Sequence, residues 1–103
     1  MSKVTIAGMT VELNEEGYLT DSSQWTKEIA KEIAKEEEVE LTDKHFELID
    51  FLRKNHENGV DLTIRKVGKS GIVDIKGFYD LFPKKPLKKS SRIAGIPKPA
   101  SCI

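Results

Sequence analysis

Apolar and polar residues alternate along the first part of the chain. On both sides of Ala7-Gly8 every second position is apolar, at Val4, Ile6, Met9, Val11 and Leu13. A period of two that is interrupted by a tight turn predicts a β-hairpin. The run Asn14-Glu15-Glu16-Gly17 predicts a second turn, after which Tyr18-Leu19 adds a short extended piece.

The apolar spacing changes to that of a helix beyond Asp21. Asp21 is a candidate N-cap with Gln24 three positions on, and apolar residues recur at helical spacing from Trp25 to Ala34. We therefore predict a first helix over residues 22–37. Three glutamates lie at its end, where the helix dipole favours bases, so we expect that end to fray.

Four further helices are predicted downstream. Thr42 is a candidate cap before a helix over residues 43–58 with a wide apolar stripe, which ends at Asn58-Gly59. Shorter helices are expected over residues 63–69, within the apolar segment 72–82 that stops at Pro83, and over the basic segment 86–94 before Gly95. Pro97 and Pro99 then force an extended path.

These elements predict a mainly α protein, a small helical bundle with a helix-turn-helix-like arrangement, an N-terminal β-hairpin and a flexible C-terminal arm. A chain of 103 residues that is 38% hydrophobic can build one modest core. We expect one helical domain over residues 1–95 and a mobile arm over residues 96–103. Six aromatic residues are expected to fill the core, namely Trp25, Phe46, Phe51, Phe78, Tyr79 and Phe82.

The formal net charge of zero conceals a division of charge along the chain. Residues 1–82 contain all seventeen acidic residues and eleven basic ones, whereas residues 83–103 contain six basic residues and no acidic one. This asymmetry favours a tail that binds another molecule, although charge alone equally allows the tail to lie against its own acidic body. We predict that six basic residues bind partner proteins: Lys84, Lys85, Lys88, Lys89, Arg92 and Lys98.

Several classes of function find little support. No apolar run approaches the roughly 20 residues that cross a bilayer, and the N-terminus lacks the apolar stretch of a signal peptide, so we expect a cytoplasmic protein without membrane association. His45 and His56 share one predicted helix about 16 Å apart along its axis, so they cannot bind one metal ion. We expect both to be surface or half-buried histidines, and we predict neither a metal site nor a cofactor.

Cys102 is the single cysteine and lies one residue from the end. A terminal cysteine can be incidental, but its neighbours Ala100 and Ser101 are small, Pro97-Lys98-Pro99 forms a spacer, and no acidic residue is near. A tip of seven residues that begins at Ile96 reaches about 20 Å, far enough to enter another protein's cleft. The thiolate is the reactive form, and we expect a partner's pocket to activate it.

The ordered set of short motifs resembles the DsrC/TusE family over nearly the whole chain. The motifs are Gly17-Tyr18-Leu19, Trp25, Leu41-Thr42-Asp43-Lys44-His45-Phe46, Phe51-Leu52-Arg53, Leu81-Phe82-Pro83, Ile93-Ala94-Gly95-Ile96-Pro97-Lys98-Pro99 and Cys102. The resemblance implies a helical body with a hairpin and a C-terminal arm. It also implies that Cys102 carries sulfur as a persulfide, either in tRNA 2-thiouridine relays or with dissimilatory sulfite reductase, whose siroheme channel the arm of family members enters.

One departure from the family pattern affects the expected role. Members that act with sulfite reductase have a second arm cysteine, whose place is taken here by Ser91. A serine hydroxyl cannot close an internal disulfide, so this chain can only accept sulfur and pass it on. The resemblance thus favours a TusE-like carrier of the sulfurtransferase type, without a substrate pocket of its own, that acts as a monomer between sulfur-donor and sulfur-acceptor proteins.

Two alternatives stay open at this point. The chain could be a DsrC-like gamma subunit of dissimilatory sulfite reductase. It could also be a DNA-binding regulator, because the helix over residues 43–58 and a short basic helix with Arg65, Lys66 and Lys69 resemble a helix-turn-helix. The acidic body, which repels phosphates, and the lack of aromatic residues in the tail argue against direct nucleic-acid binding.

Overall fold

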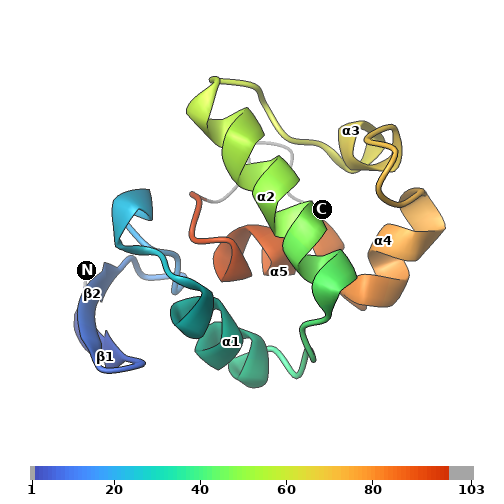
Figure 1. Cartoon of the computed structure of the whole chain (residues 1–103). Coiled ribbons are helices and arrows are strands. Elements are labelled where there is room, and N and C mark those ends of the chain that lie inside the picture. The colour runs from blue at the N-terminus through green and yellow to red at the C-terminus, as the bar shows by residue number, and fades with distance from the viewer. Residues whose placement is uncertain (1, 98–103) are drawn as a thin grey trace.

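The computed structural model describes residues 2–97, so the predictions for Lys98 and Cys102 fall outside the described residues. Figure 1 shows a small bundle of helices with a hairpin at one side. Its elements are β1 (Ser2–Ile6), β2 (Met9–Leu13), a 3-10 turn (Ser22–Gln24), α1 (Lys27–Glu36), α2 (Asp43–Glu57), α3 (Ile64–Gly68), α4 (Ile75–Leu81) and α5 (Pro86–Ile93). The predicted mainly α fold with an N-terminal hairpin is confirmed.

The hairpin turns at Ala7-Gly8, as predicted. β1 and β2 are antiparallel with Val4 opposite Val11, and Ala7 and Gly8 both have positive φ, 52° and 79°, as a two-residue hairpin turn requires. A single bridge between Leu13 and Leu19 adds the expected short extended piece. Val11 is 1% exposed and enters the core, which ties the hairpin to the helical body.

The first helix begins later than predicted. Asp21 caps only the 3-10 turn, where its carboxylate accepts a hydrogen bond from the Ser23 amide. α1 begins at Lys27, and the hydroxyl of Thr26 is its N-cap, which accepts from the Ile29 amide at 3.2 Å. Trp25 lies between the two elements with an extended backbone, and this conformation places its indole Nε1 2.8 Å from the carbonyl oxygen of Ile93.

α5 is the centre of the bundle. It packs against α1, α2 and α4, and Figure 1 shows it crossing behind α2. Leu87 and Ile93 of α5 are fully buried, as are Leu48, Ile49 and Leu52 of α2 and Ile29 and Ile33 of α1. These side chains give the molecule a single core that includes residues from the hairpin to Ile96.

The aromatic residues only partly follow the prediction. Phe78 and Phe82 are fully buried, and Trp25, Phe46 and Phe51 pack against the core while partly exposed. Tyr79 was expected in the core but is 40% exposed, because α4 is short and turns this position outward. Tyr18, which was not expected in the core, is 1% exposed and lies beside α5.

His45 is buried, contrary to the expectation of a surface or half-buried residue. It is 5% exposed, and its Nε2 lies 2.8 Å from the carbonyl oxygen of Leu81. Because a carbonyl can only accept, Nε2 carries the proton and Nδ1 accepts from the Thr42 amide at 3.1 Å. His45 therefore joins the start of α2 to the end of α4, whereas His56 is exposed. Sequence periodicity treats a histidine as polar and misses this role.

Candidate functional site

The lysines of the basic segment gather at the start of α5. Pro86 is the first helical residue, and its fixed φ suits that position. Lys84 and Lys85 precede it and are exposed, whereas Lys88 and Lys89 are half-buried. The helix dipole favours acids at a helix start, but the first turn of α5 contains none, and the Lys85 N-cap makes no side-chain hydrogen bond. The start of α5 therefore carries positive charge that its own first turn does not offset.

These lysines surround a cavity of about 330 Å³. We call it the lysine pocket; it is lined by Glu16, Tyr18, Glu37, Lys84, Lys85, Lys88, Lys89 and Arg92. The hydroxyl of Tyr18 donates to the carbonyl oxygen of Lys88 at 3.2 Å and fixes one wall of the pocket to α5. Five of the six predicted partner-binding residues therefore lie around one cavity, and Lys98 lies outside the described residues.

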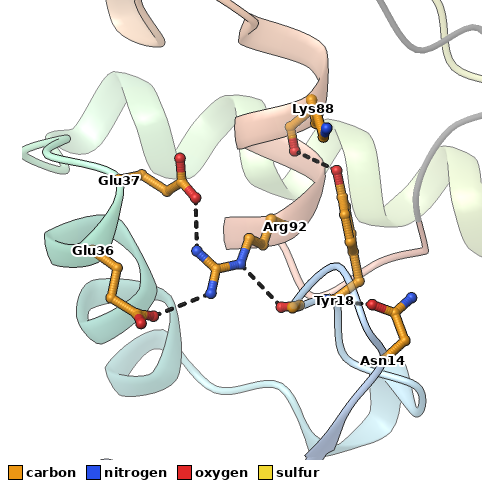
Figure 2. Close-up of polar contacts among 7 residues, drawn as sticks. Asn14, Tyr18, Glu36, Glu37, Lys88 and Arg92 are labelled. Carbon is orange, nitrogen blue, oxygen red and sulfur yellow. Dashed lines mark hydrogen bonds and ion pairs between the residues drawn. The ribbon is translucent and has the colours of Figure 1, made fainter. Parts of the chain in front are cut away.

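Arg92 differs from the four lysines because its charge is already used within the protein. Figure 2 shows its guanidinium between α1 and the loop that follows β2. Nη1 donates to Glu37 at 2.6 Å, Nη2 to Glu36 at 3.2 Å and Nε to the carbonyl oxygen of Gly17 at 3.0 Å. The Arg92 side chain is only 16% exposed. It compensates the acids at the end of α1, where the sequence predicted fraying.

The loop that accepts the Arg92 hydrogen bond is itself fixed by local contacts. The side-chain oxygen of Asn14 accepts from the amides of Glu16 at 2.9 Å and Tyr18 at 3.0 Å, as Figure 2 shows in part. Gly17 has φ of +86°, and a Cβ at this position would lie 2.9 Å from Nε of Arg92. A glycine is therefore required here both for the backbone conformation and for the approach of Arg92.

Ser91, which takes the place of the family's second arm cysteine, lies within α5, in the segment that was predicted to be helical, and is fully buried. Its hydroxyl oxygen has no hydrogen-bond partner among residues 2–97. The neighbouring Ser90 is equally buried, but its hydroxyl donates to the carbonyl oxygen of Leu87 at 3.2 Å. Buried Leu87 lies four residues before Ser91 and therefore on the same face of α5, whereas buried Ser90 and Ile93 show that α5 is covered on other sides as well.

Two other kinds of site can be assessed within the described part of the chain. Residues 2–97 contain no group of three or more His, Cys, Asp or Glu side chains that could hold a metal ion, and no helix there is long and apolar enough to cross a membrane. A second, more open cavity of about 350 Å³ lies between α3 and α4. Its lining includes Arg65 and Lys69, two residues of the helix-turn-helix alternative.

The comparison with protein families decides the identity. Residues 5–103 match the family model described as DsrC like protein. The chain belongs to this family. Proteins named Sulfurtransferase TusE are similar over almost their whole length: that of Photorhabdus laumondii is 36% identical and covers 100% of both chains, and that of Escherichia coli K12 is 38% identical and covers 93% of this chain and 95% of its own.

Solved structures of DsrC proteins have the same fold. The NMR structure of Allochromatium vinosum DsrC superposes with a TM-score of 0.82 at 33% identity, and it covers 98% of this chain and 97% of its own. The oxidized gamma-subunit of the dissimilatory sulfite reductase (DsrC) from Archaeoglobus fulgidus has a TM-score of 0.82 at 32% identity and covers 99% and 100%. The recognition of the DsrC/TusE family from sequence motifs is thereby confirmed.

Several residues around the lysine pocket of this DsrC-like chain were not assigned to a site from sequence. Tyr18 was noted only as part of a family motif, and Glu36 and Glu37 only as an unfavourable helix end. Their contacts with α5 connect residues 55 to 70 positions apart in the sequence. The available signal was the motif Gly17-Tyr18-Leu19, which places a large aromatic residue directly after a polar turn.

We expect that Arg92→Ala lowers the free energy of unfolding by about 2–3 kcal/mol. The substitution removes three charge-assisted hydrogen bonds and leaves the Gly17 carbonyl and two carboxylates without their donor. Arg92→Lys should recover less than half, because an ammonium cannot reproduce the planar fork. Urea unfolding measures the effect, and Arg65→Ala, at an exposed arginine on α3, should change it by only about 0.5 kcal/mol. Equal losses of stability in Arg92→Ala and Arg65→Ala would contradict the structural role assigned to Arg92.

We expect that Ser91→Ala raises the free energy of unfolding by about 1 kcal/mol, since it removes a buried hydroxyl that has no hydrogen-bond partner within the described part of the chain. Ser90→Ala is a matched control, because this buried serine has a hydrogen bond to lose and should be neutral or mildly destabilising. Thermal and urea unfolding of both variants compare the two positions. A loss of stability in Ser91→Ala equal to that in Ser90→Ala would mean that the Ser91 hydroxyl is bonded.

Proposed function

We propose that this chain is a sulfur carrier that accepts sulfane sulfur as a persulfide on Cys102 and passes it to a partner protein. The observation that carries the proposal is the family match, which extends to residue 103 and so includes the penultimate cysteine. The similarity to proteins named Sulfurtransferase TusE over 90% or more of this chain supports it further. The chain contains one thiol, so the sulfur has a single attachment site.

The proposed chemistry is thiol exchange without net oxidation. The Cys102 thiolate attacks the outer sulfur of a donor persulfide and forms a new S–S bond, while the S–S bond of the donor breaks and the donor cysteine leaves as a thiolate. The outer sulfur keeps its proton, so Cys102 then carries an S–SH group. Attack by an acceptor thiolate on this outer sulfur repeats the same step and restores the Cys102 thiolate.

Ser91 supports a relay carrier over a gamma subunit that uses two thiols. The solved relatives named DsrC include a gamma-subunit of dissimilatory sulfite reductase. In this chain position 91 has a hydroxyl, which cannot form a disulfide with Cys102, and the side chain is buried. Association with a sulfite reductase is the alternative proposal, for which co-purification with a siroheme enzyme is the test.

The lysine pocket is the proposed contact surface for acidic partner proteins. Lys84, Lys85, Lys88 and Lys89 supply four positive charges around one cavity at the start of α5. No acidic residue lies in segment 84–93, although Glu16 and Glu37 from other parts of the chain also line the cavity. Such a patch acts mainly by raising the rate of association with a complementary surface, and added salt screens it. Arg92 stabilises this surface, because its guanidinium binds Glu36 and Glu37 and so joins α5 to the end of α1.

Incubation with a small persulfide donor should add roughly 32 Da to the wild-type chain and nothing to Cys102→Ala. The reason is that the thiol is the proposed acceptor and the chain has no second one. Intact-mass spectrometry under non-reducing conditions measures the gain, and dithiothreitol should reverse it. The variant should unfold at the same temperature as the wild type. A mass gain that survives in Cys102→Ala would exclude Cys102 as the carrier.

The double variant Lys84→Glu/Lys85→Glu should slow sulfur transfer from a persulfide-charged protein donor roughly tenfold at low ionic strength, because it replaces attraction by repulsion. The difference should shrink as salt is added. Lys31→Glu/Lys54→Glu, at exposed lysines on α1 and α2, makes the same change in net charge away from the pocket. Stopped-flow transfer rates for both variants test the surface, and equal slowing by both would reduce the effect to net charge.

A further inference from the structure

Two side chains distant in sequence bind the end of α5 from which the chain continues toward Cys102. We call residues 93–97 the arm root. The indole Nε1 of Trp25 donates to the carbonyl oxygen of Ile93 at 2.8 Å, and Nη1 of Arg53 donates to the carbonyl oxygen of Ala94 at 2.8 Å. These are two of the last carbonyls of the helix, which have no partner within the helix itself. Trp25 and Arg53 therefore close the helix end.

Arg53 also holds Trp25 in place. Its guanidinium carbon lies 4.4 Å from the centre of the Trp25 ring, and its Nη2 donates to the carbonyl oxygen of Ser22 at 3.1 Å. A guanidinium can make these contacts together because it is planar and presents several donors, whereas an ammonium cannot. Burial lowers the pKa of Arg53, although the nearby Glu57 and Asp50 oppose this effect.

The backbone of the arm root is fixed as far as Ile96. Gly95 has φ of +72°, and the amides of Gly95 and Ile96 donate back to the carbonyls of Arg92 and Ser91 at 3.2 Å each. A Cβ at position 95 would lie 2.4 Å from Cδ1 of Trp25, so the glycine lets the backbone pass directly against the indole. Ile96 is 1% exposed. Residues 86–96 are all buried or half-buried, and Pro97 is the next residue that is exposed.

We propose that Trp25 and Arg53 are positioning residues for Cys102, because they fix the point and direction at which the chain leaves the body. With the arm root held, the residues that separate Ile96 from the thiol along the sequence are 97–102, six in number. If the last turn of α5 opened, the tether would begin near Ser91 and be about twice as long. The local concentration of a tethered group falls with about the −3/2 power of tether length, so doubling it costs about threefold.

This inference rests on the proposed function for its kinetic consequence, but the geometric part can be tested alone. Cys102 is the single cysteine, so a nitroxide label attaches there specifically. The variants are Trp25→Phe, which removes the indole N–H and the five-membered ring but keeps an aromatic side chain, and Arg53→Lys, which keeps the charge but loses the fork. Arg65→Lys on the exposed face of α3 is the matched control. Paramagnetic broadening of the body amides then maps the region that the label reaches.

We expect the broadening in wild type and Arg65→Lys to be confined to one region of the body, and to extend over more amides in Trp25→Phe and Arg53→Lys. Transfer of sulfur from Cys102 to a small thiol should stay within twofold of wild type in all variants. Transfer to a protein acceptor should fall threefold or more in Trp25→Phe and Arg53→Lys, but not in Arg65→Lys. A general loss of stability would not separate these two rates.

Specific outcomes would overturn the inference. If the broadened region is the same in wild type, Trp25→Phe and Arg53→Lys, the two residues do not position the thiol. If sulfur transfer to small thiols and to protein acceptors falls equally in these variants, the role of Trp25 and Arg53 is only structural. If Arg53→Lys does not fold, Trp25→Phe alone tests the inference, since it keeps an aromatic side chain at position 25. Failure of the wild type to take up sulfur would instead reject the proposed function. The broadening pattern would still decide whether Trp25 and Arg53 position Cys102.

Discussion

The fold depends on hydrogen bonds from long side chains to the backbone of α5. A helix of eight residues is not stable alone, because nucleation costs more than so few hydrogen bonds return. Its carbonyls at Lys88, Ile93 and Ala94 accept bonds from Tyr18, Trp25 and Arg53, which come from three other parts of the chain. Buried Leu87 and Ile93 supply the apolar contribution, and the side-chain donors fix the orientation of the helix.

This arrangement gives the two ends of α5 different tasks. Its first turn carries the lysines and lines the pocket, whereas its last turn leads into the arm root. Eight residues of helix span only about 12 Å, so a partner that binds at the lysines is held at a fixed, short distance from the point where the chain continues toward Cys102. In the proposed function, a rigid α5 links recognition of a partner to delivery of the thiol. Tyr18 and Arg92 make the contacts at the pocket, and Trp25 and Arg53 make those at the arm root.

The elements that were predicted correctly have signals within a few residues of sequence. The contacts that were not predicted join residues far apart in the sequence. The hairpin, α2 and α5 follow from periodicity and caps within a few residues. The start of α1 was misplaced because Asp21 and Thr26 are both good caps, and only the distant bond from Trp25 to Ile93 separates them. Grouping of the lysines was anticipated, but the pocket was not, since Tyr18 and Arg92 approach their partners across 70 and 75 positions.

The buried position of Ser91 connects the arm root to the sulfur chemistry. Its carbonyl accepts the Ile96 amide, and its hydroxyl faces the core without a partner among residues 2–97. A thiol at this position would be shielded by the same packing, so a bond to Cys102 would require the last turn of α5 to open against the contacts of Trp25 and Arg53. A chain that only receives and passes on sulfur needs no such opening. A closed α5 is thus consistent with a carrier whose single thiol reacts away from the body.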